Sequence, residues 1–228
     1  MKCAYLFDID GTLLNIKNKA NRVVIQNVLK QFRLTELNVK KLDFAGKTDR
    51  AIFNELLPSP SEQLFEEVKA SYLEELDAFL TRDHIHVLDG VNSAIDYLSK
   101  QGAWVGLLTG NFVEAARIKL GLAGLGSHFE FGAYGDDASS RDDLPHIAYK
   151  ELQTFSGWTF RPADLFIIGD TPRDIRCAQL FGAVSVAVAT GGYSADELRA
   201  CSPDAVLDSM HEFPEWERWY RENRQHSA

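Results

Sequence analysis

Several features that would assign the chain to a specialised class of protein are missing from its sequence. No apolar run approaches the roughly 20 residues that span a bilayer. Met1 and Lys2 lead directly into an apolar stretch that Asp8 interrupts, and this pattern predicts no signal peptide. Acidic residues outnumber basic ones by 33 to 24, and the net charge of −9 disfavours binding to nucleic acid or to anionic membranes. We therefore expect a cytoplasmic protein that binds neither.

Cysteine is scarce as well. Cys3, Cys177 and Cys201 are scattered and odd in number, which predicts reduced thiols, and none of them has the spacing of a metal site. His84 and His86 lie close together, but no third ligand is near them, which predicts a metal-free linker. By contrast, 228 residues with 45% hydrophobic content suffice for a substantial core, in one large domain or one domain with a modest insert.

Apolar runs and helical stripes alternate through the second half of the chain. Strands are predicted at residues 104–108, near 129–133, at 165–168 and at 184–188, with helices between them. Together with the apolar run that begins at Tyr5, this order predicts an α/β fold, a Rossmann-like parallel sheet with helices on both faces. Ligands of such sheets lie beyond the carboxyl ends of the strands.

The stretch between the first strand and this alternating part is different. Helices are predicted around residues 23–32, over 49–57 with a stop at Pro58-Ser59-Pro60, and from Ser61 onward. No strand is predicted before His84. We therefore predict an all-helical cap domain at residues 16–85, inserted into a core domain of residues 1–15 and 86–228.

Two shorter segments complete the predicted organisation. Residues 15–18 are polar and are predicted to link the first strand to the helical insert. Residues 213–220 carry aromatic side chains at helical spacing, which favours a helix packed on the sheet over a surface for a partner.

The most specific pattern is the apolar run from Tyr5 that ends in Asp8-Ile9-Asp10-Gly11-Thr12. Alternate residues of an extended chain point to the same side, so Asp8 and Asp10 can face one small volume. Two carboxylates that close repel each other, and a divalent cation or a positively charged partner would relieve the repulsion. Taken alone, the pattern also fits an Asp-Gly turn at a solvated strand end.

Polar residues follow two further predicted strands. Thr109-Gly110-Asn111 opens a helix, where backbone N–H groups and the Thr hydroxyl can hold a phosphate. Asn111 with Glu114 also fits a capping box, and both interpretations can hold at once. Asp170 ends a buried strand, and Thr171 with Asp174 fits a helix cap. Asp170 itself has no such structural explanation.

In this order the patterns resemble the motifs of the haloacid dehalogenase superfamily, over nearly the whole chain. The resemblance rests on Asp-x-Asp-Gly-Thr, on Thr109 after the second core strand, and on Gly-Asp followed four residues later by Asp174. The family usually places a Lys-Pro pair before the last motif, whereas this chain has Arg141-Asp142 there. A guanidinium can take two phosphate oxygens, so we favour Arg141 over its competitor Lys150, which is predicted to lie on a helix surface.

The resemblance implies a Mg²⁺-dependent phosphatase. By analogy with the family, Asp8 is the nucleophile that forms an aspartyl-phosphate, and Asp10 is the general acid and base. The implied metal ligands are Asp8, Asp170 and the backbone carbonyl of Asp10. The presence of the second acid separates this chain from the family's dehalogenases and from its ion-pumping ATPases.

The resemblance also gives roles to the remaining groups. Thr109 and Arg141 would hold the phosphoryl oxygens together with the backbone around Gly110 and Asn111. Asp174 would orient Arg141 or a metal-bound water.

Residues 45–50 resemble the substrate-reading segment of phosphoglycolate-phosphatase-like members, which makes Lys47, Thr48 and Arg50 candidate substrate-binding residues. An ordinary helix start, with Thr48 as its cap and both cations in solvent, fits equally well. The expected substrate is a small phosphorylated metabolite, with phosphoglycolate as the first candidate. The alternatives are a phosphomutase of the same fold, similar to β-phosphoglucomutase, and a non-catalytic regulatory module. The sequence leaves monomer and homodimer both open.

Overall fold

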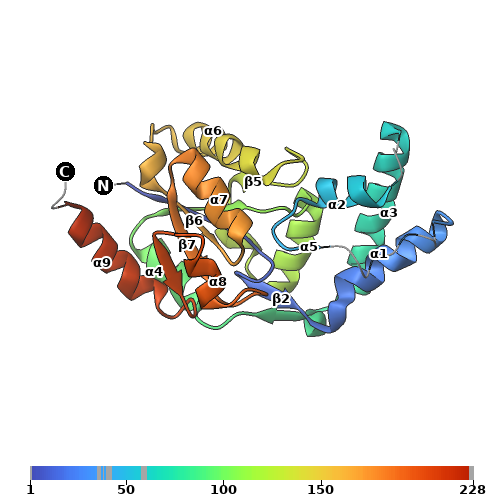
Figure 1. Cartoon of the computed structure of the whole chain (residues 1–228), viewed down its shortest axis with the longest axis horizontal. Coiled ribbons are helices and arrows are strands. Elements are labelled where there is room, and N and C mark those ends of the chain that lie inside the picture. The colour runs from blue at the N-terminus through green and yellow to red at the C-terminus, as the bar shows by residue number, and fades with distance from the viewer. Residues whose placement is uncertain (1, 35–36, 38, 40–42, 58–60, 226–228) are drawn as a thin grey trace.

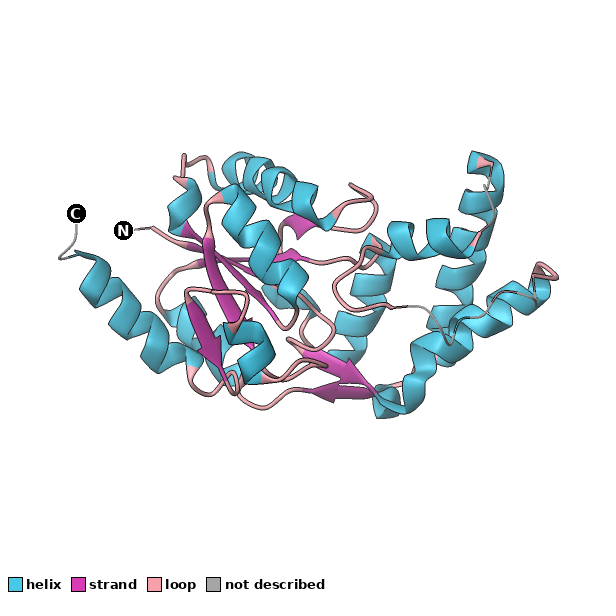
Figure 2. Cartoon of the chain, viewed as in Figure 1, coloured by secondary structure: helices cyan, strands magenta, loops and turns pink. Residues whose placement is uncertain are grey.

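A parallel β-sheet forms the centre of the computed structural model, which describes residues 2–34, 37, 39, 43–57 and 61–225 (Figures 1 and 2). Six strands of this described part pair in the order β5-β4-β1-β6-β7-β8, and every pair is parallel. They are β1 (Ala4–Phe7), β4 (Trp104–Leu108), β5 (Gly132–Ala133), β6 (Leu165–Gly169), β7 (Val184–Val188) and β8 (Ala205–Leu207). The predicted α/β fold is therefore confirmed.

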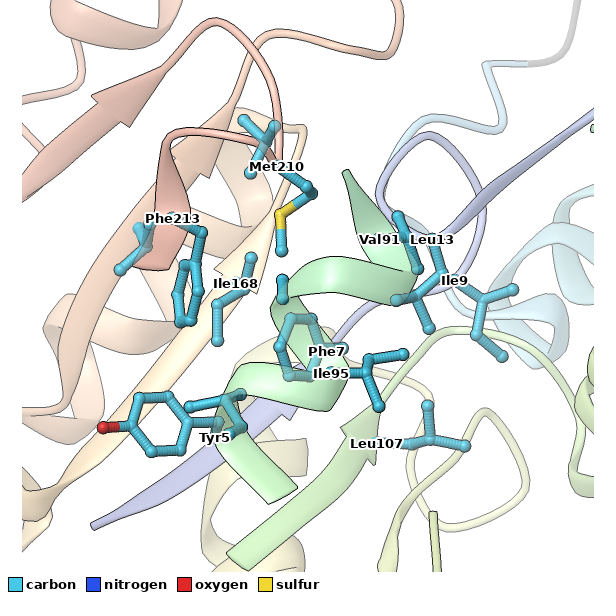
Figure 3. Close-up of a cluster of buried hydrophobic side chains, with 14 of the residues drawn as sticks. Tyr5, Phe7, Ile9, Leu13, Val91, Ile95, Leu107, Ile168, Met210 and Phe213 are labelled. Carbon is cyan, nitrogen blue, oxygen red and sulfur yellow. The ribbon is translucent and has the colours of Figure 1, made fainter. Parts of the chain in front are cut away.

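Strand β1 is buried on both faces, as a central parallel strand requires. Tyr5 and Phe7 point into one layer of core, and Ala4 and Leu6 point into the other. The first layer, shown in Figure 3, is closed mainly by α4 (Val91–Lys100), α5 (Val113–Ala123) and α9 (Phe213–Gln225). The second layer is closed by α6 (Leu144–Ser156) and α7 (Pro172–Phe181).

Helix α9 is the predicted aromatic tail, and it packs on the sheet as expected. Phe213 is fully buried, and Trp216 meets the ring of Phe166 on β6 edge-on. On the same helix, the buried Glu217 accepts hydrogen bonds from the hydroxyl groups of Tyr5 and Tyr97. These bonds satisfy a carboxylate that burial alone would make costly.

Several short elements were not predicted, and one prediction was wrong. Residues 14–16 form a strand, β2 (Leu14–Ile16), which pairs antiparallel with β3 (Ile85–Val87). A three-residue strand is too short to show an alternating pattern, so the segment resembled a linker. For the same reason β8 and the five-residue helix α8 (Ala195–Arg199) escaped prediction, and β5 is shorter than the predicted run at 129–133.

Three helices form a separate group at one end of the molecule (Figure 1): α1 (Ala20–Gln31), α2 (Asp49–Leu56) and α3 (Glu62–Phe79). They share a buried apolar cluster that also includes Phe112 and Ala115 of the core. The insert therefore packs on the first turn of α5. Its predicted limits fall in the β2–β3 pair, and the predicted stop at 58–60 lies outside the described residues. No helix within the described part of the chain is long and apolar enough to cross a membrane.

Candidate active site

The carboxyl ends of the central strands bring together the residues that the motifs predict. Asp8 follows β1, Thr109 follows β4, and Asp170 follows β6. All three side chains are buried. Because β1 lies between β4 and β6, Asp8 is at the centre of this edge.

Arg141 is the cation that lies beside Asp8. It begins the turn before α6 and is only 5% exposed, and its Nη2 lies 3.3 Å from Oδ1 of Asp8. The same nitrogen pairs with Asp174 and donates to the carbonyl of Leu108 at 3.1 Å. Burial opposes its charge, but the carboxylates of Asp174 and Asp8 outweigh this effect and raise the pKa of the guanidinium. The competitor Lys150 lies exposed on α6.

Asp8, Asp170 and Asp174 form a buried acidic cluster, with one oxygen of each within 4.8 Å of the others. Desolvation by burial raises the pKa of Asp8 to about 6 despite the nearby guanidinium. Burial, reinforced by the charges of Asp174 and Asp8, raises the pKa of Asp170 to about 8. Arg141 therefore compensates this negative charge only in part.

The surroundings of Asp170 fit a divalent cation bound through oxygen. A Cβ atom at Gly191 would lie 1.6 Å from Oδ2 of Asp170, and one at Gly11 would lie 2.3 Å away. Gly11 also has a φ of +86°, which favours glycine. The backbone at Gly11 and at Gly191 therefore lies directly against the Asp170 carboxylate, where no larger side chain would fit. Hard cations such as Mg²⁺ prefer carboxylate and carbonyl oxygens, so the donor set of Asp8 and Asp170 suits this ion.

Asp174 is held by its own helix start. Thr171 and Asp174 form the predicted capping box at the beginning of α7, and Oδ2 of Asp174 accepts from the Thr171 hydroxyl at 2.7 Å. The carboxylate therefore both caps α7 and pairs with Arg141.

Asp10 does not join the acidic cluster, because two donors hold its side chain elsewhere. Its Oδ2 accepts from Nδ2 of Asn111 at 2.8 Å and from Nζ of Lys119 at 2.7 Å. Lys119 also donates to Oδ1 of Asn111 at 2.5 Å. Sequence reasoning missed Lys119, although it lies four residues after the buried Ala115 and three after Ala116 on one face of α5. This helical spacing was the available signal.

The start of α5 differs from the predicted capping box. Asn111 does not cap this helix, since its side chain binds Asp10, Lys119 and the hydroxyl of Thr109. Two acids from other segments cap it: Asp49 accepts from the N–H of Phe112 at 2.8 Å, and Asp136 accepts from the N–H of Val113 at 2.6 Å. Burial raises the pKa of Asp49 to about 6, against the opposing charge of Lys119.

The insert touches this edge of the sheet through residues 46–49. The backbone N–H of Asp49 donates to the carbonyl of Gly110 at 2.6 Å, and a Cβ at Gly110 would lie 2.1 Å from the carbonyl oxygen of Lys47. Thr48 caps α2 through a bond from the N–H of Ala51 and also donates to the carbonyl of Ser139. The two backbones are therefore in direct contact at Gly110.

The two candidate cations of the insert lie differently. Lys47 lines the cavity described below, although its ammonium pairs with Glu55 at 2.6 Å. Arg50 points away from it, toward Glu62 and Glu66, and its guanidinium lies over the ring of Phe65. The structure thus brings Lys47 to the site and leaves Arg50 outside it.

A cavity of about 280 Å³ lies between the insert and the strand ends. Its core side is lined by Asp8, Asp10, Gly110, Asn111, Lys119 and Arg141. Its opposite side is lined by residues of the 15–52 segment, among them Lys19, Lys47 and Asp49. The predicted nucleophile and both buried cations therefore share one space that a small ligand can enter.

Fold and site together define an α/β enzyme whose centre combines carboxylates with two buried cations. The sequence profile of the haloacid dehalogenase-like hydrolases matches residues 5–188, and the chain belongs to this family. The chain is 28% identical to a phosphoglycolate phosphatase of Nitrosococcus oceani over 163 residues, which cover 72% of this chain and 71% of the relative. It is 27% identical to the pyrophosphatase PpaX of Bacillus thuringiensis over 213 residues, 90% and 91% of the two chains. The enzyme is accordingly phosphatase-like.

Solved structures of the family share the fold. A putative haloacid dehalogenase-like hydrolase from Bacteroides fragilis superposes with a TM-score of 0.73 at 20% identity, over 93% of this chain and all of that one. CbbY from Rhodobacter sphaeroides, solved in complex with phosphate, superposes with a TM-score of 0.70 at 19% identity, over 93% and 96% of the two chains.

Proposed function

We propose that the chain is a Mg²⁺-dependent phosphatase that hydrolyses a small phosphorylated metabolite through an aspartyl-phosphate on Asp8. The observation that supports this most directly is the contact between Asp8 and Arg141 at the cavity. A buried carboxylate 3.3 Å from a guanidinium can attack phosphorus while the cation holds the phosphoryl oxygens.

Two displacements account for the hydrolysis. In the first, an oxygen of Asp8 bonds to phosphorus, the bond from phosphorus to the substrate oxygen breaks, and Asp10 gives that oxygen a proton. In the second, water attacks phosphorus, the bond to Asp8 breaks, and Asp10 accepts a proton from the water. Asp10 suits both steps because its side chain is 38% exposed and its Oδ2 is already fixed, which leaves Oδ1 for proton transfer.

The remaining groups position the phosphoryl oxygens. The hydroxyl of Thr109 accepts from Nδ2 of Asn111 at 2.9 Å, so its own hydrogen is available to donate. Asp174 keeps the guanidinium of Arg141 aimed at Asp8. Mg²⁺ held by Asp8, Asp170 and the backbone carbonyl of Asp10 would reduce the repulsion between carboxylate and phosphate.

The cavity volume and the relatives guide the choice of substrates. A space of about 280 Å³ suits a small ester better than a nucleic acid or a protein. Two relatives are named as a phosphoglycolate phosphatase and a pyrophosphatase, so phosphoglycolate and pyrophosphate are the first compounds to test. A phosphomutase would share the first displacement but return the group to a second hydroxyl.

The test is phosphate release from a panel of small phosphate esters and pyrophosphate, with Mg²⁺ and with chelator. Asp8→Asn removes the nucleophile at nearly constant size, and Asp77→Asn, on the exposed side of α3, is the matched control. We expect release that requires Mg²⁺, is lost in Asp8→Asn and is unchanged in Asp77→Asn. Release that persists in Asp8→Asn would contradict the mechanism, and release that needs a bisphosphate activator would favour the mutase.

A further inference from the structure

Lys119 is a buried cation for which the motifs give no role. Among the described residues it is the only buried lysine, with 2% of its surface exposed. Lysine is almost never fully buried unless it is paired, because its ammonium group loses its hydration. Its position on the second turn of α5, facing the cavity, therefore requires an explanation.

The contacts of Lys119 all lead to one carboxylate. Its ammonium donates to Oδ2 of Asp10 and to Oδ1 of Asn111, and Asn111 donates in turn to the same Oδ2. Lysine only donates and a carboxylate only accepts, so these partners fix the orientation of the Asn111 amide. The three side chains form a closed triangle with Asp10 at one corner.

This triangle constrains Asp10 in a specific way. Both donors hold the same oxygen, so the carboxylate cannot rotate without breaking a charge-assisted hydrogen bond. Oδ1 takes no part in the triangle, and Asp10 is one of the residues that line the cavity. Asp8, by contrast, has its own cation in Arg141. The two catalytic acids thus have separate cations.

We propose that Lys119 is a positioning residue that acts through Asp10 and holds its free oxygen where a proton is exchanged with the leaving group and with water. This inference rests on the proposed phosphatase activity. It assigns Lys119 to both displacements, since Asp10 gives a proton in the first and accepts one in the second.

The choice of substrate separates these two steps. An alkyl oxygen leaves poorly without a proton, whereas p-nitrophenolate leaves as an anion. When Lys119 is replaced by Met, the first step with p-nitrophenyl phosphate should be spared, while the hydrolysis of the phosphorylated enzyme should be slowed. We therefore expect a burst of p-nitrophenolate of about one equivalent per site, followed by a slow steady state. With an alkyl phosphate, kcat should fall about tenfold to a hundredfold with no burst and little change in KM.

A double-mutant cycle tests whether Lys119 acts through Asp10. In the Asp10→Asn background, the change Lys119→Met should alter kcat by no more than about twofold, because its partner is already impaired. Ethylammonium should partly restore Lys119→Ala but not Lys119→Ala combined with Asp10→Asn. Lys150→Met, which removes an exposed lysine of α6, is the control that should leave all rates unchanged.

Each outcome decides between roles. Circular dichroism and thermal unfolding establish that the variants are folded, and Lys119→Gln replaces the Met variant if that one is not. Equal losses on both substrates without a burst, or a full loss of rate in the Asp10→Asn background, would overturn the proposal and assign Lys119 to the phosphoryl group or to stability alone. If the wild type itself shows no release that depends on Asp8, the proposed function fails instead.

Discussion

The metal-free protein should become less stable as the pH rises, and Asp170 should be the main cause. A carboxyl group whose pKa is raised by folding, here from 3.8 to about 8, keeps its proton longer than the unfolded chain does. Between these two values the folded protein binds more protons than the unfolded chain. The contribution of Asp170 to stability is therefore largest below this interval and falls as the pH rises through it.

The size of the effect follows from this difference. Each pH unit in the interval lowers the free energy of unfolding by about 1.4 kcal/mol for one group, or about 3 kcal/mol from about pH 5 to pH 7. For a domain of this size, that corresponds to a fall in Tm of about 6–12 °C. The change Asp170→Asn removes the charge that causes the loss, so the variant should be more stable than the wild type near pH 7.

Thermal unfolding in chelator, followed over this pH range for wild type and Asp170→Asn, measures the effect directly. Asp77→Asn makes the same side-chain replacement on an exposed part of α3 and should follow the wild type. Excess Mg²⁺ should remove most of the pH dependence of the wild type and leave Asp170→Asn unaffected. A Tm that stays constant or rises toward pH 7 in the metal-free wild type would refute the reasoning.

Three further changes separate catalysis, the contact of the insert with α5, and stability. Replacing Arg141 by Met removes the buried guanidinium and should lower kcat for phosphate release about a hundredfold or more, with Lys150→Met as the unaffected control; equal activities would contradict its role. Asp49→Ala removes the side-chain hydrogen bond from the insert to α5. Enzyme kinetics should show a KM raised several-fold, and denaturant titration should show the free energy of unfolding lowered by about 1 kcal/mol. An unchanged KM would show that this contact does not matter for substrate binding. Tyr5→Phe removes a hydrogen-bond donor from the buried Glu217 and should lower the free energy of unfolding by about 1–3 kcal/mol, with kcat unchanged. A loss of activity in folded protein would contradict a purely structural role for this pair.

The strand-end residues could be predicted because their position depends on the sheet alone. Asp8, Thr109 and Asp170 each follow an apolar run, and parallel strands bring such positions to one edge whatever the loops do. Arg141 could be placed by its order along the chain, and its burial follows from the acids around it. The substrate-reading role of Lys47 and Arg50 could not be decided in this way, because it depends on which way each side chain turns.

Other parts depend on contacts between distant segments. Lys119 lies on α5 and donates a hydrogen bond to Asp10, which is more than a hundred residues earlier in the chain. The only local sign that this lysine is buried is the pair of small buried residues on its side of the helix. Asn111 and Glu114 matched a local capping pattern, but Asp49, far away in sequence, occupies that role. Local rules predict the most probable partner, and tertiary structure supplies a different one here.

The capping of α5 limits how freely the two halves of the enzyme can be exchanged. One of its first amides is bound by Asp49 of the insert and the next by Asp136 of the core, so neither half completes this helix alone. A chimera that receives the helical insert of another family member would leave the N–H of Phe112 without its acceptor unless the new segment also brings an acid to position 49. New substrate preferences introduced by such a graft would then be accompanied by a loosened start of α5, the helix that carries Lys119. The insert can therefore be exchanged as a unit only if its replacement also carries the carboxylate of Asp49.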